Sequence, residues 1–170
     1  MKLENIFQMF HNLLFPLAPF YWLLAFLRRF LYEKNILKKK RLPKAVISVG
    51  NLSVGGTGKT PITISVGKYL KEKGYKVAIL SRGYKRKSKE EIIKCDKSLN
   101  PKICGDEPFL MIKKGLDVYV GKNRYKSGLY ALKNDCYDIF ILDDGFQHFQ
   151  LHRDINILVI DANNPFWEDK

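Results

Sequence analysis

The chain has 170 residues, of which 46% are hydrophobic and 28% are charged. This composition excludes a disordered tail and a disulfide-rich miniprotein, and the length suits one domain with an appendage. Lysine and arginine outnumber aspartate and glutamate by 30 to 17, so the net charge of +13 favours a polyanionic partner. The three cysteines show no C-x-x-C spacing, so we expect neither a disulfide framework nor a zinc site, and we expect a reducing compartment.

The positive charge lies in the first two thirds of the chain. Residues 28–44 hold eight basic residues and one acidic residue, and residues 68–102 hold twelve and four. Residues 103–170 hold eight basic and eleven acidic residues, so the chain is basic early and mildly acidic late. The basic clusters contain no recognisable nucleic-acid-binding motif, so we expect no nucleic acid partner and favour a phospholipid or a phosphorylated substrate.

Residues 1–44 are predicted to form an apolar helix and a basic linker. No charged side chain occurs from Asn5 to Leu27, a stretch close to the roughly 20 residues that span a bilayer. Pro16 and Pro19 are expected to interrupt this helix and to leave about two continuous turns on either side. The favoured prediction is a segment that lies in the interface of an anionic membrane. A spanning helix and a helix packed on the rest of the protein are the alternatives.

Residues 45–170 alternate between apolar strands and amphipathic helices. The pattern predicts strands at 45–50, 76–80, 118–120, 139–142 and 155–160. It predicts helices at 60–73, 106–114 and 123–133, with Gly74 and Gly115 ending the first two. Residues 81–103 are polar and basic, and we expect a long loop or an irregular hairpin there. Strands that are apolar almost throughout indicate an α/β fold, with a mostly parallel sheet and helices on both faces.

Residues 50–60 read G-N-L-S-V-G-G-T-G-K-T and lie between a predicted strand and a predicted helix, as a phosphate loop requires. Lys59 can bridge the β- and γ-phosphates of a nucleotide, and Thr60 can hold Mg²⁺. Three glycines let the backbone turn its N–H groups toward a phosphate, namely Gly55, Gly56 and Gly58. A glycine-rich turn without a ligand is the alternative.

Two positions of this segment depart from known patterns. Ser53 stands where the general consensus expects glycine, and it can still accept the turn if its φ is negative. Val54 stands where partition-type ATPases carry a signature lysine, which disfavours that family.

Carboxylates follow the predicted strand at 139–142. A P-loop enzyme presents such an acid to Mg²⁺, so one of Asp143 and Asp144 could face a metal while the other holds the next loop. Gln147 and His148 could bind substrate hydroxyls or phosphate, although a histidine beside a sheet is often structural.

Two further segments have both a structural and a functional interpretation. Asp106 could be the N-cap of a helix with Pro108 in its first turn, or a general base for a sugar hydroxyl. Residues 81–87 follow a strand end, where α/β proteins bind ligands, and could hold a substrate phosphate or form a solvated basic loop.

Along about residues 40–164 the chain resembles the tetraacyldisaccharide 4′-kinase (lipid A 4′-kinase) family, and so a P-loop NTPase-like fold. The matching segments are I-S-V-G-N-L-S-V-G-G-T-G-K-T-P at 47–61, L-S-R-G-Y-K-R at 80–86, G-D-E-P at 105–108, L-D-D-G-F-Q-H at 142–148 and L-H-R-D at 151–154. Ser53 is normal in this family, so the departure from the general consensus supports the resemblance.

The resemblance implies ATP- and Mg²⁺-dependent phosphorylation of the 4′-hydroxyl of a lipid A disaccharide 1-phosphate. It implies a peripheral or monotopic protein at the cytoplasmic face of the inner membrane of a Gram-negative bacterium. The implied catalytic residues are Asp106 as general base, Lys59, Asp143 and Asp144, with Thr60 and Asp143 at the metal. The implied nucleotide-binding residues are Ser53, Val54, Gly55, Gly56, Thr57, Gly58, Lys59 and Thr60. Substrate binding is expected at Arg82, Tyr84, Arg86, Glu107, Gln147 and His148.

Family members continue beyond the point that corresponds to Lys170, into a second lobe that carries a glutamate for Mg²⁺ and a histidine that partners the general base. We therefore expect residues 45–170 to be an N-terminal kinase lobe, with the C-terminal lobe as a missing partner. The alternatives are a non-catalytic lobe and a membrane-associated nucleotide-binding protein.

Overall fold

The computed structural model describes residues 18–34, 36–51, 58–84 and 86–162. The chain divides into two compact units, residues 1–39 and residues 40–170. Each unit is described by itself.

The first unit contains α2 (Ala18–Glu33), a helix of 16 residues. Pro19 lies in the first turn of α2, where backbone N–H groups have no hydrogen-bond acceptor within the helix, so the missing N–H of proline costs nothing. The prediction that proline limits this helix to about two turns was therefore wrong, because the helix continues through Arg28 and Arg29 to its end. None of the helices in the described ranges is long and apolar enough to cross a membrane. Residues 1–17, with Pro16, lie outside the description.

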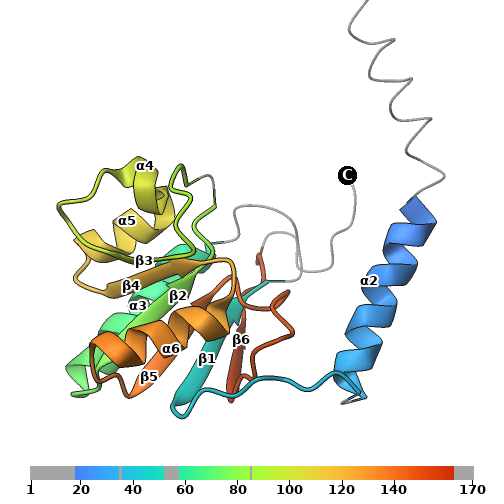
Figure 1. The fold of residues 1–170 in the computed structure, drawn as a ribbon. Helices are drawn as coiled ribbons and strands as arrows, with labels where there is room; N and C mark the ends of the chain where they lie inside the picture. The colour runs from blue at the N-terminus through green and yellow to red at the C-terminus, as the bar shows by residue number, and fades with distance from the viewer. Residues whose placement is uncertain (1–17, 35, 52–57, 85, 163–170) are drawn as a thin grey trace, which may run out of the picture. The chain divides into compact units, whose positions relative to one another are not determined.

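The second unit contains a six-stranded sheet in the order β3-β4-β2-β5-β1-β6 (Figure 1). Five strands are parallel, and β3 pairs antiparallel with β4 at one edge. Apolar residues fill the parallel strands almost continuously, as expected for a sheet that is buried on both faces. The strands are β1 (Ala45–Gly50), β2 (Val77–Ser81), β3 (Ile92–Cys95), β4 (Asp117–Gly121), β5 (Ile139–Asp143) and β6 (Ile155–Leu158).

Helices cover both faces of the sheet. On one face, α3 (Lys59–Glu72) and α5 (Asp106–Lys113) pack on alternate strand residues such as Val49, Ile79 and Ile141. On the other face, α6 (Arg124–Asn134) packs on the intervening residues, which include Leu80 and Phe140 (Figure 1). The predicted α/β sheet, mostly parallel with helices on both faces, is confirmed.

Residues 81–103, expected to be a long loop or an irregular hairpin, contain β3 and most of the short helix α4 (Pro101–Cys104). A strand of four residues at a sheet edge has little periodicity, so it escapes detection in the sequence. The structure also joins Cys95 to Cys104 in a disulfide, with the two Cα atoms 6.2 Å apart. One disulfide is not a framework, but the sequence did not indicate this pair, because a nine-residue spacing forms no motif and the chain between β3 and α4 brings the sulfur atoms together.

Candidate functional site

The carboxyl ends of three neighbouring parallel strands meet at one edge of the sheet. Val49 of β1 is in register with Asp143 of β5, and Leu80 of β2 is in register with Leu142 of β5. The helix α3 begins at the same edge, because residues 51–58 join it directly to β1. This edge is where ligands bind in open α/β sheets. The fold therefore brings together the segments after β1, β2 and β5 that the sequence singled out.

Lys59, the first residue of α3, is held between two strand ends. Its ammonium donates a hydrogen bond to Oδ1 of Asn51, at 2.8 Å, and lies 3.8 Å from Oδ1 of Asp144. The side chain of Lys59 is 18% exposed, whereas that of Asp144 is 58% exposed. Asn51 and Asp144 thus hold the Lys59 ammonium at the carboxyl ends of β1 and β5.

The predicted phosphate loop is described only at its end. Residues 52–57, which include Ser53, Val54, Gly55, Gly56 and Thr57, lie outside the described residues. Gly58 has φ 75°, a left-handed conformation that favours glycine, and it forms the N-cap of α3. Thr60 is half-buried in the first turn of α3. The nucleotide-binding roles of this segment remain predictions.

Asp143 is a buried carboxylate at the end of β5, with a side chain that is 3% exposed. Hydroxyl groups donate to both of its oxygens, from Thr63 of α3 at 3.4 Å and from Ser81 of β2 at 3.3 Å. Burial, followed by the nearby charges of Glu107 and Asp144, raises the pKa of Asp143 to about 6, and the hydrogen bonds from Ser81 and Thr63 oppose this shift. A cation at this position would relieve these penalties, so Asp143 could hold a metal ion.

A tight turn separates Asp144 from Asp143. Asp144 has φ 51°, which turns the chain sharply after β5, and the N–H of Gly145 then donates to the carbonyl of Val49 at 3.1 Å. A Cβ atom on residue 145 would collide with Oγ of Ser48 and lie 2.6 Å from Cβ of Leu142. The turn buries one carboxylate and exposes the other, as two different roles require.

The segment after this turn carries Gln147, which is exposed, and His148, which is half-buried. The backbone N–H of His148 donates to the carbonyl of Gly145 at 3.0 Å. Arg153 donates to the carbonyls of Gly145 and Phe146, at 3.1 Å and 3.2 Å. The loop is therefore anchored beside the strand ends, and substrate binding by its side chains remains a prediction.

Asp106 and Glu107 occupy the first turn of α5, and both are exposed. The N-cap is Gly105, with φ 100°, so the alternative in which Asp106 caps the helix is wrong. Glycine is required here, because an added Cβ atom would lie 3.0 Å from the carbonyl oxygen of Tyr84. The Asp106 carboxylate is therefore presented at a helix start, and the charge of Glu107 reaches Asp143.

The loop after β2 is held against β4 by Arg86. The Arg86 guanidinium donates to the carbonyls of Val120, Glu90 and Glu91, at 3.1 Å, 2.7 Å and 3.4 Å. Arg82 and Tyr84 are exposed on the same loop. These contacts give Arg86 a structural role, and the predicted substrate contacts of Arg82, Tyr84 and Arg86 remain predictions.

Arg124 is a residue of this site that the sequence reasoning missed. It begins α6 just after β4, its side chain is 6% exposed, and its Nη1 donates to the carbonyl of Lys122 at 3.2 Å. Its Nε is buried and has no hydrogen-bond partner within the described part of the chain. Burial lowers the pKa of Arg124, nearby Arg82 lowers the pKa further, and Asp143 and Asp144 oppose the shift.

A cation at a helix N-terminus is unfavourable, because the helix dipole places partial positive charge there. A buried arginine in that position suits a site that receives an anion such as phosphate. The sequence offered one sign of Arg124, a basic residue shortly after an apolar strand. That pattern is too common to single out a functional residue without the structure.

Together, the strand-end lysine, the buried arginine and the buried carboxylate have the chemistry that a phosphorylated ligand and its cation require, and their binding roles remain predictions. The chain belongs to the tetraacyldisaccharide-1-phosphate 4′-kinase family, whose model matches residues 10–170.

Named relatives and a solved structure agree with this assignment. The chain is 44% identical over 161 residues to a tetraacyldisaccharide 4′-kinase of Pelobacter propionicus, covering 91% of this chain and 45% of that protein. It is 48% identical over 158 residues to one from Aquifex aeolicus, covering 89% and 49%. The crystal structure of "apo" form LpxK from Aquifex aeolicus in complex with ATP is similar with a TM-score of 0.77 and 46% identity. That alignment covers 88% of this chain and 48% of the solved one, so the chain spans about half the length of these relatives.

Proposed function

We propose that this chain takes part in the tetraacyldisaccharide 4′-kinase reaction, in which the γ-phosphate of ATP is transferred to the 4′-hydroxyl of a lipid A disaccharide 1-phosphate. The observation that carries the proposal is the position of Lys59, whose ammonium contacts Asn51 after β1 and Asp144 after β5. The residue before Asp144 is the buried carboxylate Asp143. Family membership supports the reaction, and a relative solved in complex with ATP supports the donor.

In this proposal, ATP binds with its phosphates at the N-terminus of α3. The sequence assigns residues 53–58 to the phosphate loop, and the ammonium of Lys59 neutralises the charge that develops between the β- and γ-phosphates. Asn51 keeps this ammonium at the end of β1 before ATP arrives. Preorganised charge of this kind stabilises a phosphoryl-transfer transition state without any covalent chemistry.

The residues present fit Mg²⁺. Asp143 has a raised pKa because it is buried among other acidic groups, and hydroxyls surround it, so a divalent ion would complete its environment. In the ranges that the structure describes, no three or more histidine, cysteine or acidic side chains are grouped so that they could hold a metal ion by themselves. Mg²⁺ on a nucleotide commonly uses only one or two carboxylates besides phosphate oxygens and water. Asp143 and Thr60 would hold the ion, and the ion would neutralise negative charge on the phosphates.

Asp106 is the proposed general base. Its carboxylate is exposed at the start of α5, where it could accept the proton of the sugar hydroxyl as that oxygen attacks the γ-phosphate. Glu107, Gln147 and His148 are proposed to contact the sugar.

The first unit is proposed to hold the protein at an anionic membrane surface, at the cytoplasmic face of the inner membrane. Among its exposed side chains are Phe20, Trp22, Leu23, Leu24, Phe26, Leu27 and Phe30. The rings of Trp22 and Phe26 stack with centroids 5.5 Å apart, so the apolar side chains form a compact surface. Basic residues follow this surface along the chain, as interfacial segments require.

The proposed function is tested by transfer of labelled γ-phosphate from ATP to lipid A disaccharide 1-phosphate in detergent micelles. We expect transfer by the 170-residue chain and its loss in Lys59→Ala. Mg²⁺–ATP binding without any transfer would contradict kinase activity in this chain and would favour a nucleotide-binding protein.

A further inference from the structure

No step of the proposed reaction uses the L-H-R-D segment at 151–154. Leu151 is buried in the core, and the N–H of Asp154 donates to the carbonyl of Val46 at 2.8 Å. The Asp154 carboxylate in turn accepts a hydrogen bond from the N–H of Val46, also at 2.8 Å. The backbone on both sides of Arg153 is therefore attached to the core and to β1.

The Arg153 side chain contacts the loop that follows β5. Its Nη1 donates to the carbonyls of Gly145 and Phe146, at 3.1 Å and 3.2 Å. The guanidinium carbon lies over the Phe146 ring, 5.7 Å from the ring centroid, and a cation and a ring attract each other within roughly 6 Å. One side chain thus holds two successive peptide groups and the aromatic side chain of the second.

The positive charge of Arg153 is not neutralised by a carboxylate. In the part of the chain that the structure describes, no acidic side chain forms an ion pair with it. The side chain is half-buried, and burial lowers the pKa of Arg153. Partial burial of a cation without an acidic partner costs free energy, which the two carbonyls and the ring offset. Arg153 therefore contributes more to the position of the loop than to the stability of the fold.

The carbonyl of Gly145 that Arg153 contacts belongs to the turn that carries two candidate substrate-binding residues. The same oxygen accepts the N–H of His148 at 3.0 Å, and the N–H of Gly145 donates to the carbonyl of Val49 at 3.1 Å. Gln147 lies within this turn. The orientation of Gly145 therefore sets where the side chains of Gln147 and His148 start, and Arg153 fixes that orientation.

The ring of Phe146 extends these contacts to the end of β1. A Cβ atom on Gly50 would lie 2.7 Å from Cγ and from Cδ1 of this ring, so the ring packs directly on the Gly50 backbone. The next residue, Asn51, accepts the hydrogen bond from Lys59. A chain of contacts through Arg153, Phe146 and Gly50 therefore connects the loop after β5 to the start of the predicted phosphate loop.

We propose that Arg153 is a positioning residue for phosphoryl transfer, which holds residues 145–148 in a fixed position relative to the start of the predicted phosphate loop. The proposal rests on the proposed function for the reaction itself. Arg153 acts through the loop and contacts neither ATP nor the acceptor. A displacement of about 1 Å in such a loop slows a transfer reaction by about 100-fold. ATP affinity changes less, because Lys59 keeps both of its partners.

The first measurement separates transfer from nucleotide binding. Single-turnover transfer of labelled phosphate and titration with a non-hydrolysable ATP analogue are compared in the wild type, R153Q and R153K. We expect R153Q to transfer phosphate about tenfold to 100-fold more slowly, with an ATP affinity within about twofold of the wild type. R153K should recover part of the rate, because an ammonium can donate to the same carbonyls but lacks the planar guanidinium that stacks on a ring.

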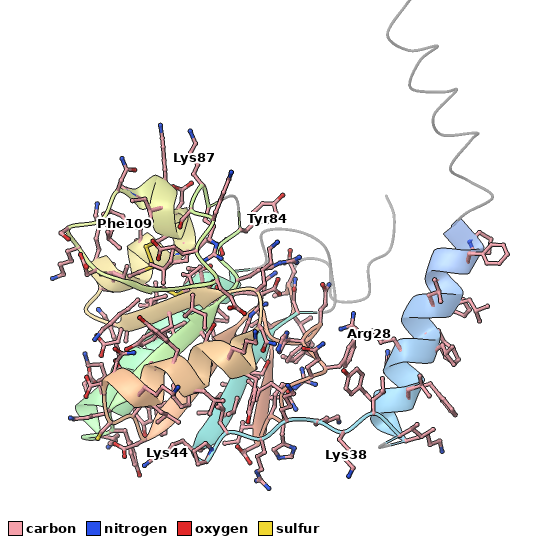
Figure 2. The ribbon with its side chains drawn as sticks, in the orientation of Figure 1. Arg28, Lys38, Lys44, Tyr84, Lys87 and Phe109 are labelled. Atoms are coloured by element: carbon pink, nitrogen blue, oxygen red, sulfur yellow. A yellow bond between two sulfur atoms is a disulfide. The ribbon has the colours of Figure 1, made fainter. Side chains whose placement is uncertain are left out.

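The matched control is K71Q. Lys71 also donates to a glycine carbonyl, that of Gly115 at 2.6 Å. Gly115 precedes β4 and so lies at the amino ends of the parallel strands, the end of the sheet at which Figure 2 shows Lys44, opposite to Tyr84. We expect K71Q to transfer phosphate at the wild-type rate, although it loses a contact of the same kind as R153Q does.

The second measurement does not depend on catalysis. Amide hydrogen exchange is followed at Gly145 and His148, whose N–H groups both form backbone hydrogen bonds. We expect both amides to exchange about tenfold faster in R153Q than in the wild type or K71Q, because the turn opens more often without the Arg153 contacts.

Three outcomes would overturn the proposal. The first is transfer by R153Q at the rate of K71Q. The second is a loss of ATP affinity in R153Q as large as its loss of transfer rate, which would assign Arg153 to the nucleotide site. The third is equal exchange of the two amides in R153Q and K71Q. A wild type without transfer would contradict the proposed function, and the exchange of the two amides would then decide by itself whether Arg153 positions the loop.

Discussion

The ammonium of Lys59 lies 2.8 Å from the amide oxygen of Asn51, so the first side chain of α3 is tied to the residue that follows β1. The hydrogen bond orients the lysine before any nucleotide is present, which reduces the entropy lost on binding.

Asn51→Ala is expected to weaken ATP binding by about threefold to tenfold, because Lys59 loses the partner that orients it. Lys59→Ala is expected to weaken binding more, since the charge itself is lost. Isothermal titration with a non-hydrolysable ATP analogue measures both effects. Asn134→Ala is the control, because that amide is exposed on α6 and donates to the carbonyl of Tyr130 in the same helix. Equal affinity in Asn51→Ala and the control would contradict the positioning role.

Asp143→Asn is expected to stabilise the protein at pH 7 in the presence of EDTA. The pKa of Asp143 is raised to about 6, so the folded state binds a proton more tightly than the unfolded state does. The wild type therefore loses stability as pH rises from about 4 to 6, and the penalty is complete above that range. It amounts to about 2–3 kcal/mol. Thermal denaturation at pH 7 and pH 4.5 should show the advantage of Asp143→Asn shrinking at the lower pH. An advantage of the same size at both values would rule out titration of Asp143 as its cause.

Asp106→Asn is expected to slow phosphoryl transfer by about 100-fold or more at saturating ATP, because the amide cannot accept the proton of the sugar hydroxyl. ATP affinity should change little, since the carboxylate is exposed at the start of α5. Single-turnover transfer of labelled phosphate measures the first quantity and titration measures the second. Glu72→Gln, at the far end of α3, is the matched control. Transfer by Asp106→Asn at the control rate would remove the general-base assignment.

Arg124→Gln is expected to leave the ligand-free protein as stable as the wild type or more stable, because a buried charge is removed. The rise in melting temperature that saturating Mg²⁺–ATP produces should become smaller, since the anion loses a cationic partner. Differential scanning fluorimetry with and without ATP measures both quantities. Arg124→Lys should recover part of the ligand effect, and an ATP-induced shift of wild-type size in Arg124→Gln would exclude contact with phosphate.

The double variant W22E/F26E is expected to lower co-sedimentation with phosphatidylglycerol vesicles by about tenfold. Both rings are exposed on α2, and a buried carboxylate in the membrane interface is costly. The control Y69E/Y75E places two glutamates at exposed aromatic positions of α3 and the following turn. Equal sedimentation of the two variants would contradict membrane association through α2.

Local patterns in the sequence predicted most of the elements. The apolar runs at 45–50 and 139–142 became β1 and β5, and Gly74 and Gly115 follow the ends of α3 and α5 with φ 89° and 84°. These signals succeed because strand periodicity and left-handed glycines act within a few residues. The edge strand β3 and the full length of α2 beyond Pro19 were not predicted, since tertiary pairing and the position of a proline within the first turn decide them.

The sequence by itself determined the family, the order of the elements and the residues at the strand ends, because motifs and periodicity depend on neighbours along the chain. Only the tertiary structure decided that Asp143 is buried beside Ser81 while Asp144 is exposed, and that the charges of both act on the pKa of buried Arg124. It alone joined Cys95 to Cys104 and gathered Lys122 with the cations of the β2 loop. Burial, electrostatic shifts and convergent charge arise from strand register and chain packing, which bring together residues that are distant in sequence.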